Sequence, residues 1–254
     1  MLFVTMNRLG QSGKTTLARY VLTPRLEGAL MLSAESSTQD GAENLLIKSV
    51  GSGGAQTLGA ALAGVTGLGR PVVLDVGSAD TDVALPLILA HAAGGNATHV
   101  VIPFRAAAKA ASAAVALLDD LQGKTGLLVS MVANCLEAAA DLERDGYQAV
   151  AKMAEAKGAQ LLSVGLVQNE WLHGAGKINS FEDIKGAAET DPSSLDKQCA
   201  AALKKGDLAA LTSLGGQRAR IEAAQRAIAN TQAVFNALKT RHSAGSAEGL
   251  RRDR

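Results

Sequence analysis

Residues able to bind phosphate cluster near the start of the chain, in the run Gly10-Gln11-Ser12-Gly13-Lys14-Thr15-Thr16. Glycine lets the backbone turn its N–H groups toward an anion, and a helix that follows presents its positive end to the same point. The lysine would reach the β- and γ-phosphates of a nucleotide, and the first threonine would bind Mg²⁺. The run therefore predicts a phosphate-binding loop. The residues expected to contact the nucleotide are Arg8, Gly10, Gln11, Ser12, Gly13, Lys14, Thr15 and Thr16.

The segments on either side of this run are those that a phosphate loop requires. Residues 2–6 are apolar without alternation, which predicts a strand buried on both faces. Residues 17–22 are helix-forming and stop before Pro24. The general pattern has a glycine five positions before Gly13, where this chain has Arg8, so the loop is a variant.

Acidic residues lie at or just beyond the ends of two further apolar runs. Residues 29–32 predict a buried strand that leads to Glu35, and the strand predicted over residues 71–76 contains Asp75 near its end. Ligands of open α/β sheets lie beyond the carboxyl ends of the strands. We therefore expect Asp75 to hold Mg²⁺ together with Thr15, the alternative being a capping aspartate in a turn. Glu35 is either near the phosphates or an exposed turn residue. The residues predicted to act in catalysis are Lys14, Glu35 and Asp75.

The rest of the chain alternates apolar runs with helix-forming stretches. Strands are predicted over residues 99–102, 126–132 and 160–167, and helices over residues 40–49, 56–66, 83–93 and 138–157. Asp80 and Asp82 are expected to cap the helix over residues 83–93. Asn134 follows a strand and either pairs with a purine edge or forms a turn. The alternation predicts an α/β fold, a mostly parallel, doubly wound P-loop NTPase sheet with helices on both faces.

Composition bounds the class of protein. The net charge is +1, and 47% of the residues are hydrophobic but only 3% aromatic. This charge predicts no global attraction to nucleic acid or membrane. Cys135 and Cys199 match no metal-binding spacing and are expected to be reduced. With no run of eighteen apolar residues and no targeting segment evident, we expect a cytoplasmic protein without a membrane segment.

The C-terminal part of the chain has a different character. We expect a single domain over residues 1–242, with helices over about residues 193–240 packed on it, and a flexible tail at 243–254. Between Gln217 and Arg254 there are eight Arg or Lys against three Asp or Glu. This basic stretch is either a solvated face or a weak non-specific contact for DNA.

The run from Asn7 to Thr16 resembles the deviant Walker A loop of the ParA/MinD ATPases, whose pattern is lysine-glycine-glycine-x-glycine-lysine-threonine. The signature lysine of that family falls on Leu9, with Arg8 beside it, and its Asp-x-Asp switch falls on Ser33-Ala34-Glu35. The longer run to Ser36 is similar to the StbB-type and related mobilisation-region ATPases of bacterial plasmids.

The resemblance implies ATP and Mg²⁺ as cofactors, a nucleotide-sandwich homodimer and a DNA-bound adaptor protein as partner. It implies a role in plasmid stability, partition or conjugative mobilisation. By position, Lys14 is the phosphate lysine, Thr15 the Mg²⁺ ligand, Asp75 the Walker B acid and Asn134 the adenine-reading residue. Two alternatives stay open: a nucleotide-gated scaffold with little hydrolysis, and a small-molecule ATP-dependent ligase or kinase.

Overall fold

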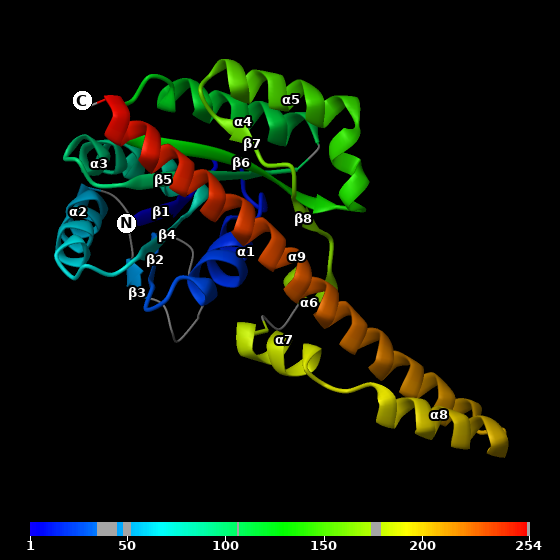
Figure 1. The fold of residues 1–254 in the computed structure, drawn as a ribbon. Helices are drawn as coiled ribbons and strands as arrows, with labels where there is room; N and C mark the ends of the chain where they lie inside the picture. Colours follow the sequence, from blue (N-terminus) through cyan, green and yellow to red (C-terminus); the bar gives the residue numbers. More distant parts are fainter. Residues whose placement is uncertain (35–44, 48–51, 106, 174–178, 253–254) are drawn as a thin grey trace.

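The computed structural model describes residues 1–34, 45–47, 52–105, 107–173 and 179–252, and its centre is a parallel sheet (Figure 1). The strand order is β3-β2-β4-β1-β5-β6-β7, with β8 paired to β6, and each pairing is parallel. β1 is central, and Val4 lies between Leu74 and Val100 in register. The strands are β1 (Leu2–Thr5), β2 (Leu30–Ala34), β3 (Leu45–Ile47), β4 (Val72–Val76), β5 (Thr98–Phe104), β6 (Leu127–Leu136), β7 (Gln160–Leu161) and β8 (Leu166–Val167).

Helices connect the strands and form the C-terminal third of the chain. The loop after β1 enters the short helix α1, which continues as a π-helix, η1. The helical elements are α1 (Lys14–Thr16), η1 (Leu17–Leu22), η2 (Thr23–Arg25), α2 (Ser52–Thr66), η3 (Ser78–Asp80), α3 (Thr81–Ala93), α4 (Ala108–Leu121), η4 (Ala139–Glu143), α5 (Asp145–Ala156), α6 (Glu170–His173), α7 (Phe181–Ala188), α8 (Ser193–Lys205) and α9 (Leu208–Arg252).

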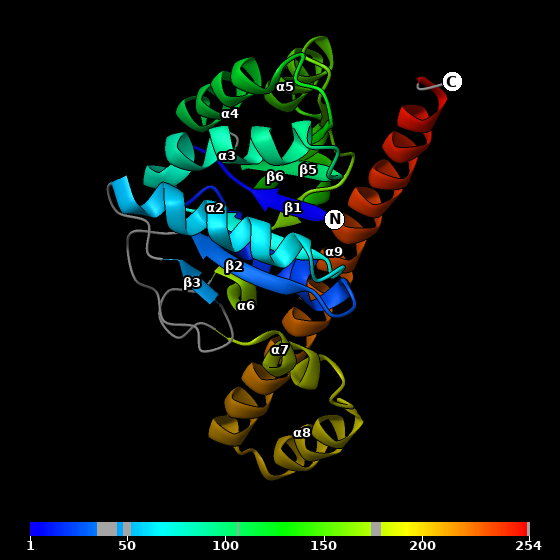
Figure 2. The same ribbon diagram turned by 90° about the vertical axis from the view of Figure 1, so that its left-hand side faces the viewer.

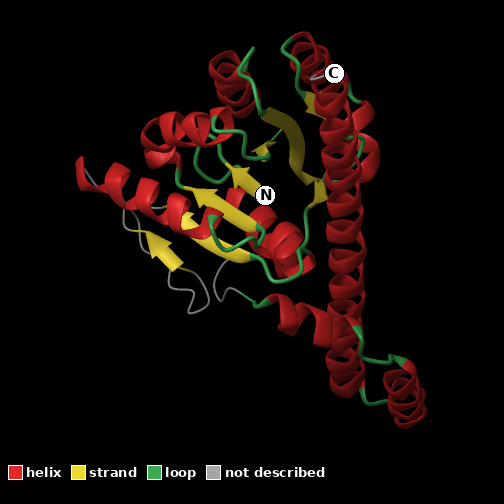
Figure 3. Ribbon diagram, turned by 60° about the vertical axis from the view of Figure 1, so that its left-hand side comes forward, coloured by secondary structure: helices red, strands yellow, loops and turns green. Residues whose placement is uncertain are grey.

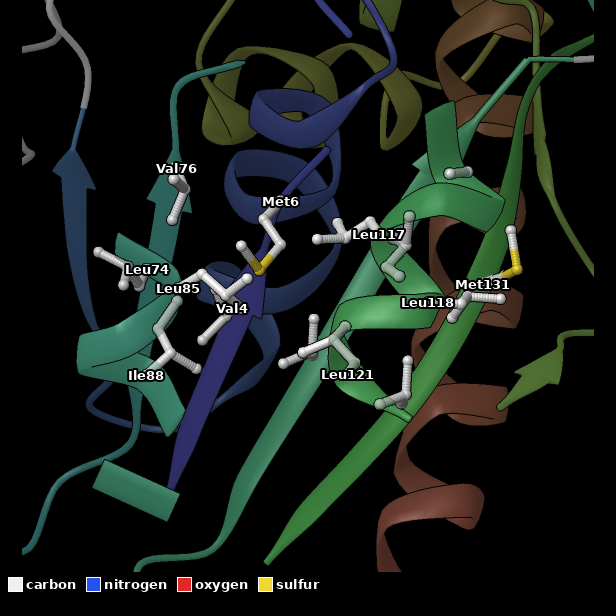
Figure 4. Packing of buried hydrophobic residues seen from close by; sticks show 14 of the residues in the cluster. Val4, Met6, Leu74, Val76, Leu85, Ile88, Leu117, Leu118, Leu121 and Met131 are labelled. Carbon is white, nitrogen blue, oxygen red and sulfur yellow. The ribbon is translucent and has the colours of Figure 1, made fainter. Parts of the chain in front are cut away.

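Both faces of the sheet are covered, as the unbroken apolar strands predict (Figure 2). Successive strand side chains point to opposite faces, so Val4 belongs to one hydrophobic cluster and Phe3 to the other. The cluster of Val4 packs against α2, α3, α4 and α5, and includes Met6, Ile88 and Leu117 (Figure 4). The cluster of Phe3 packs against η1 and α9. The α/β fold with helices on both faces of a parallel sheet is therefore confirmed.

The first part of α9 and the whole of α8 extend beyond the sheet (Figures 1 and 3). We call α8 and residues 208–220 of α9 the arm. Within the arm, Leu195 and Ala202 are buried, whereas Leu203 is 68% exposed and Leu208 is 75% exposed. Further along α9, Val234, Phe235 and Leu238 are buried against the sheet. Among the described side chains of α8 and α9, those that pack in the hydrophobic cluster of the sheet come from the later part of α9.

The helix predicted over residues 40–49 is wrong at residues 45–47, whereas the flexibility of the tail at 243–254 stays a prediction. Within the stretch predicted as a helix over residues 40–49, residues 45–47 form β3, because three successive apolar residues pair with the edge strand β2. α9 continues to Arg252, through most of the segment predicted as a flexible tail. A helix already formed is extended without a new nucleation cost, so weak helix formers can follow a packed segment.

Candidate functional site

The loop between β1 and α1 lies at the carboxyl end of the central strand, where the sequence places it. Gly13 has φ of 104° and Gln11 has φ of 56°, so both adopt the left-handed region. Gln11 occupies the position of the second glycine in the ParA/MinD pattern. The Leu17 N–H donates to the Gly13 carbonyl at 3.0 Å, which starts the helix directly after the turn. The backbone therefore has the glycine turn followed by a helix N-terminus that an anion requires.

Lys14 and Thr15 occupy the positions that phosphate and metal binding would use. Lys14 is 8% exposed, and its Nζ donates to the Leu9 carbonyl at 3.0 Å across the loop. The Thr15 hydroxyl donates to Asp75 Oδ2 at 2.7 Å. The lysine thus spans the loop in which a phosphate would lie, and the hydroxyl lies beside the Asp75 carboxylate.

Asp75 is 3% exposed and belongs to β4, next to β1. Its Oδ1 accepts from the Thr5 hydroxyl at 3.1 Å, and Thr5 and Asp75 are register partners. The two threonines therefore orient both oxygens of one carboxylate. No local pattern in the sequence points to Thr5, which becomes a neighbour of Asp75 only through strand pairing.

The donor set formed by Thr15 and Asp75 fits Mg²⁺, which prefers oxygen ligands and keeps several waters or phosphate oxygens. Bound Mg²⁺ would supply charge neutralisation at the phosphates, and Thr15 and Asp75 are the residues that would hold it. Across the described part of the chain, no group of three or more His, Cys, Asp and Glu residues is arranged to hold a metal by itself. A magnesium ion here would therefore take its remaining ligands from nucleotide phosphate oxygens and water.

Asn7 fixes the first half of the loop, although sequence reasoning assigned it no role. It is fully buried, its Nδ2 donates to the Pro103 carbonyl at 2.8 Å, and its Oδ1 accepts from the Leu9 N–H at 2.9 Å. An asparagine that accepts from the N–H two residues on forms an Asx-turn. The residue type directly before the loop was the signal that could have identified it.

Arg8 is held by carboxylates of its own chain. Its Nη2 lies 2.8 Å from Asp82 Oδ1 on α3, and its Nη1 lies 2.7 Å from Asp120 Oδ2 on α4. Hydrogen bonds to Asp82 and Asp120 raise the pKa of Arg8, so it stays charged. The prediction that Asp80 and Asp82 cap the following helix holds only for the position of Asp80. Asp80 occupies the N-cap position of α3 without a side-chain cap hydrogen bond, and Asp82 pairs with Arg8 across the sheet edge.

Asn134 lies against the loop between β1 and α1, which is the predicted phosphate loop. It is 1% exposed, and its Nδ2 donates to the Ser12 carbonyl at 2.9 Å. Its Oδ1 lies 3.0 Å from Nε2 of His173. A Cβ placed on Gly13 would lie 2.1 Å from Asn134 Nδ2, so this asparagine also explains why position 13 must be glycine. The reading of an adenine edge by Asn134 stays a prediction.

The other predicted residues differ in what surrounds them. Ser12 is 1% exposed, and its buried hydroxyl has no hydrogen-bond partner among the described residues. A Cβ on Gly10 would make only an ordinary contact, 3.7 Å from the Ser78 hydroxyl. Thr16 ends α1 and is half-buried. Glu35 lies outside the described residues. The loop, Asp75 and Asn134 are thus brought together as predicted, and His173, Asn7 and Thr5 join them.

Part of the basic C-terminal stretch is engaged within the chain. Arg218 forms ion pairs with Asp196 and Glu222, and Arg226 lies 3.9 Å from Glu222. The guanidinium of Arg220 lies over the Trp171 ring at 5.1 Å. Several of the charges counted as basic in the sequence therefore have protein partners. The helices of the described residues include none that is both long and apolar enough to span a membrane.

Comparison with known proteins gives a likeness of fold. No family model matches the chain, and no curated protein matches its sequence. Apo McdA of Cyanothece is 16% identical, with 89% of this chain and 98% of that chain covered and a TM-score of 0.47. A McdA variant in complex with ATP is 16% identical, with coverages of 90% and 96% and a TM-score of 0.44. The MinD cell division protein of Aquifex aeolicus is 13% identical, with coverages of 63% and 79% and a TM-score of 0.41.

Proposed function

We propose that the chain is a ParA-like nucleotide-binding ATPase, which binds ATP with Mg²⁺ at the loop between β1 and α1. The observation that carries this proposal is the contact between the Thr15 hydroxyl and the Asp75 carboxylate, 2.7 Å apart beside Lys14. A phosphate loop alone binds an anion, but the hydroxyl of Thr15 in α1 and the carboxylate of Asp75 in β4 would add oxygen ligands for the magnesium ion of a nucleotide.

The first experiment compares the ATP affinity of the wild type with that of Lys14→Ala, by calorimetry in the presence of Mg²⁺. Lys14 would interact directly with the phosphates, so we expect the variant to bind at least tenfold more weakly, about 1.4 kcal/mol. Lys152→Ala, an exposed lysine on α5, is the matched control and should bind as the wild type does. Equal binding by wild type and Lys14→Ala would overturn the proposal.

Magnesium dependence is tested by Thr15→Val, which keeps the shape of the side chain and removes the hydroxyl. We expect the affinity for ATP to depend on Mg²⁺ in the wild type and to lose most of that dependence in the variant. Thr16→Val is the adjacent control, because the proposal assigns the metal to Thr15 and Asp75 and not to Thr16. If Thr15→Val keeps the full response to Mg²⁺, Thr15 is not a metal ligand.

A second candidate, a nucleotide-gated scaffold with little hydrolysis, is favoured by the contacts of Arg8. Leu9 stands where the ParA/MinD family has its signature lysine, and the neighbouring Arg8 is engaged by Asp82 and Asp120. In this arrangement the Arg8 guanidinium is engaged by two carboxylates of its own chain, and position 9 carries no charge. Steady-state release of phosphate distinguishes the two candidates: turnover that disappears in Asp75→Ala supports the ATPase, and its absence in the nucleotide-bound wild type supports the scaffold.

We further propose a role in plasmid partition, stability or mobilisation, with ATP-dependent dimerisation controlling contact with a DNA-bound adaptor protein. The support is the resemblance of the loop to that family. Sedimentation with and without ATP tests dimerisation, and a mass independent of ATP would remove it. For weak non-specific binding of DNA, deletion of residues 243–254 should lower the affinity and its salt dependence. This deletion leaves the packed residues Val234, Phe235 and Leu238 in place.

A further inference from the structure

A chain of hydrogen bonds connects helix α6 to the phosphate loop. The Asn169 N–H donates to His173 Nδ1 at 3.2 Å, His173 Nε2 lies 3.0 Å from Asn134 Oδ1, and Asn134 Nδ2 donates to the Ser12 carbonyl at 2.9 Å. Asn134 is buried and His173 half-buried. Nothing in the order of residues along the chain connects position 173 with position 12.

The direction of each bond in this chain is fixed by its two ends. His173 Nδ1 accepts from a backbone N–H, so the ring proton of neutral His173 is on Nε2. Nε2 therefore donates to Asn134, which must present its oxygen. The amide nitrogen of Asn134 then faces the Ser12 carbonyl, which can only accept. Turning the amide over would place two acceptors together at one end and two donors at the other.

His173 is neutral in this arrangement. Burial lowers its pKa, and the positive charge of Arg105 lowers the pKa further, while the Asn169 N–H can donate to Nδ1 only when that nitrogen carries no proton. A neutral ring is required, because protonated Nδ1 would face the Asn169 N–H as a second donor.

The Ser12 carbonyl is the point at which this chain acts on the loop. The described chain contains no cis peptide bond, and in a planar trans peptide the C=O and the following N–H point in opposite directions. When the Ser12 carbonyl is held toward Asn134, the Gly13 N–H is held away from it. Gly13 has φ of 104°, and Asn134 occupies the space of its missing Cβ. The asparagine amide therefore fixes the orientation of a peptide group of the phosphate loop.

The end of this series of hydrogen bonds that lies farthest from the loop, at Asn169, is attached to α9. The side-chain amide of Asn169 donates to the Ala223 carbonyl at 2.9 Å, and the indole N–H of Trp171 donates to the Arg220 carbonyl at 3.0 Å. Trp171 also packs with Ala223 and Ala224 in a hydrophobic cluster. The segment that carries His173 is thus attached at two points to α9, whose later part packs on the sheet.

We propose that His173 is a positioning residue of the phosphate loop, which holds the Asn134 amide so that it sets the peptide between Ser12 and Gly13. For its effect on nucleotide affinity this inference depends on the proposed function. The effect of His173 on the conformation of the loop is independent of the proposed function. His173 touches neither the nucleotide nor the metal in this assignment and acts through Asn134.

Two substitutions at position 173 separate this role from a local structural one. His173→Gln places an amide N–H near the position of Nε2 and keeps the donor to Asn134. His173→Asn places an oxygen near the position of Nδ1, which keeps the acceptor for Asn169 and loses the reach to Asn134. If His173 positions Asn134, the variant His173→Gln should behave like the wild type. The variant His173→Asn should then behave like His173→Ala. A role confined to α6 predicts the reverse.

The readout is the affinity for ATP with Mg²⁺, measured for the wild type and for the Ala, Gln and Asn variants. We expect His173→Ala and His173→Asn to bind about tenfold more weakly, and His173→Gln within about twofold of the wild type. His91→Gln is the control, because His91 on α3 bonds to Thr98 at the start of β5, outside the loop and its contacts. Equal affinity in all variants, or rescue by Asn instead of Gln, would overturn the inference.

Hydrogen exchange without nucleotide gives an independent readout. The amides of residues 12–14 should exchange faster in His173→Ala and His173→Asn than in the wild type and His173→Gln. If the wild type fails to bind ATP while this exchange pattern holds, the proposed function fails and the positioning role stands. If ATP binds and depends on Lys14, but the exchange of these amides is the same in all variants, the positioning role fails alone.

Discussion

The phosphate loop and the arm differ in the number of directions from which they are held. The loop is contacted from five elements: by Asp75 of β4, Pro103 of β5, Asn134 of β6, Asp82 of α3 and Asp120 of α4. His173 of α6 supports it through Asn134. In the arm, α8 packs against α9, and Leu203 and Leu208 stay exposed. A segment held from many sides has one conformation and tolerates little change, whereas a helix pair held along one line tolerates substitution on its outer faces.

The largest effect is expected for Gly13→Ala. The new Cβ would lie 2.1 Å and 2.6 Å from atoms of Asn134, at a residue with φ of 104°. Strain and overpacking together should lower the free energy of unfolding by roughly 3 kcal/mol. Urea denaturation followed by Trp171 fluorescence measures this. A loss below about 1 kcal/mol would show that the loop adapts as easily as a surface turn.

The next largest effect is a loss of stability in acid. It concerns the sheet and its loop and not the arm, because the arm contains no histidine. Burial, His242 and Arg241 lower the pKa of His99 from 6.5 to about 3. Between these values the unfolded chain binds a proton that the native chain does not, so the free energy of unfolding falls as the pH falls below 6.5. Burial lowers the pKa of His91, His173 and His242 in the same direction.

For His99 alone the loss between pH 6.5 and pH 5 should be on the order of 2 kcal/mol. Urea denaturation at the two pH values measures it. His99→Gln retains a group that can bond to Ser130, the partner of His99 Nε2 at 2.9 Å, and should show a smaller change with pH. The same pH dependence in this variant would contradict the assignment.

In the arm, the matched glycine substitution is Gly215→Ala. Gly215 is an exposed residue inside α9, and a Cβ there would have nothing within 4 Å. Alanine is favoured over glycine in a helix interior, so the free energy of unfolding should rise by about 0.5–1 kcal/mol where the arm unfolds with the rest. The sign is opposite to that of Gly13→Ala. A destabilising result would mean that this face of α9 is more closely packed than the structure shows.

The smallest effect is expected for Leu208→Ser. Leu208 is 75% exposed, so its substitution removes little buried surface and should change the free energy of unfolding by less than about 0.5 kcal/mol. Leu238→Ala, at a fully buried position of the same helix, should cost about 3 kcal/mol and serves as the contrast. Similar values for the two would show that the arm leucine is covered in solution.

Much of the sheet was predictable because buried parallel strands are short apolar runs. The runs at β1, β2 and β4 are apolar on both faces, and the structure buries nearly every residue in them. β3 was missed because three apolar residues carry no period that separates strand from helix. The strand predicted over residues 160–167 forms two short strands, β7 and β8, that both pair with β6.

By itself, the sequence determined the glycine turn that joins one strand to one helix and places Lys14 and Thr15, since these features depend on the local backbone. The tertiary structure alone decided which side chains support that loop. Arg8 forms hydrogen bonds with Asp82, which lies 74 residues away in the sequence, and the Ser12 carbonyl accepts from Asn134, which lies 122 residues away. Local spacing places residues on a face of a helix or strand, but only the order of the strands brings such distant side chains together. His173, which carries no local signal, reaches the loop for this reason.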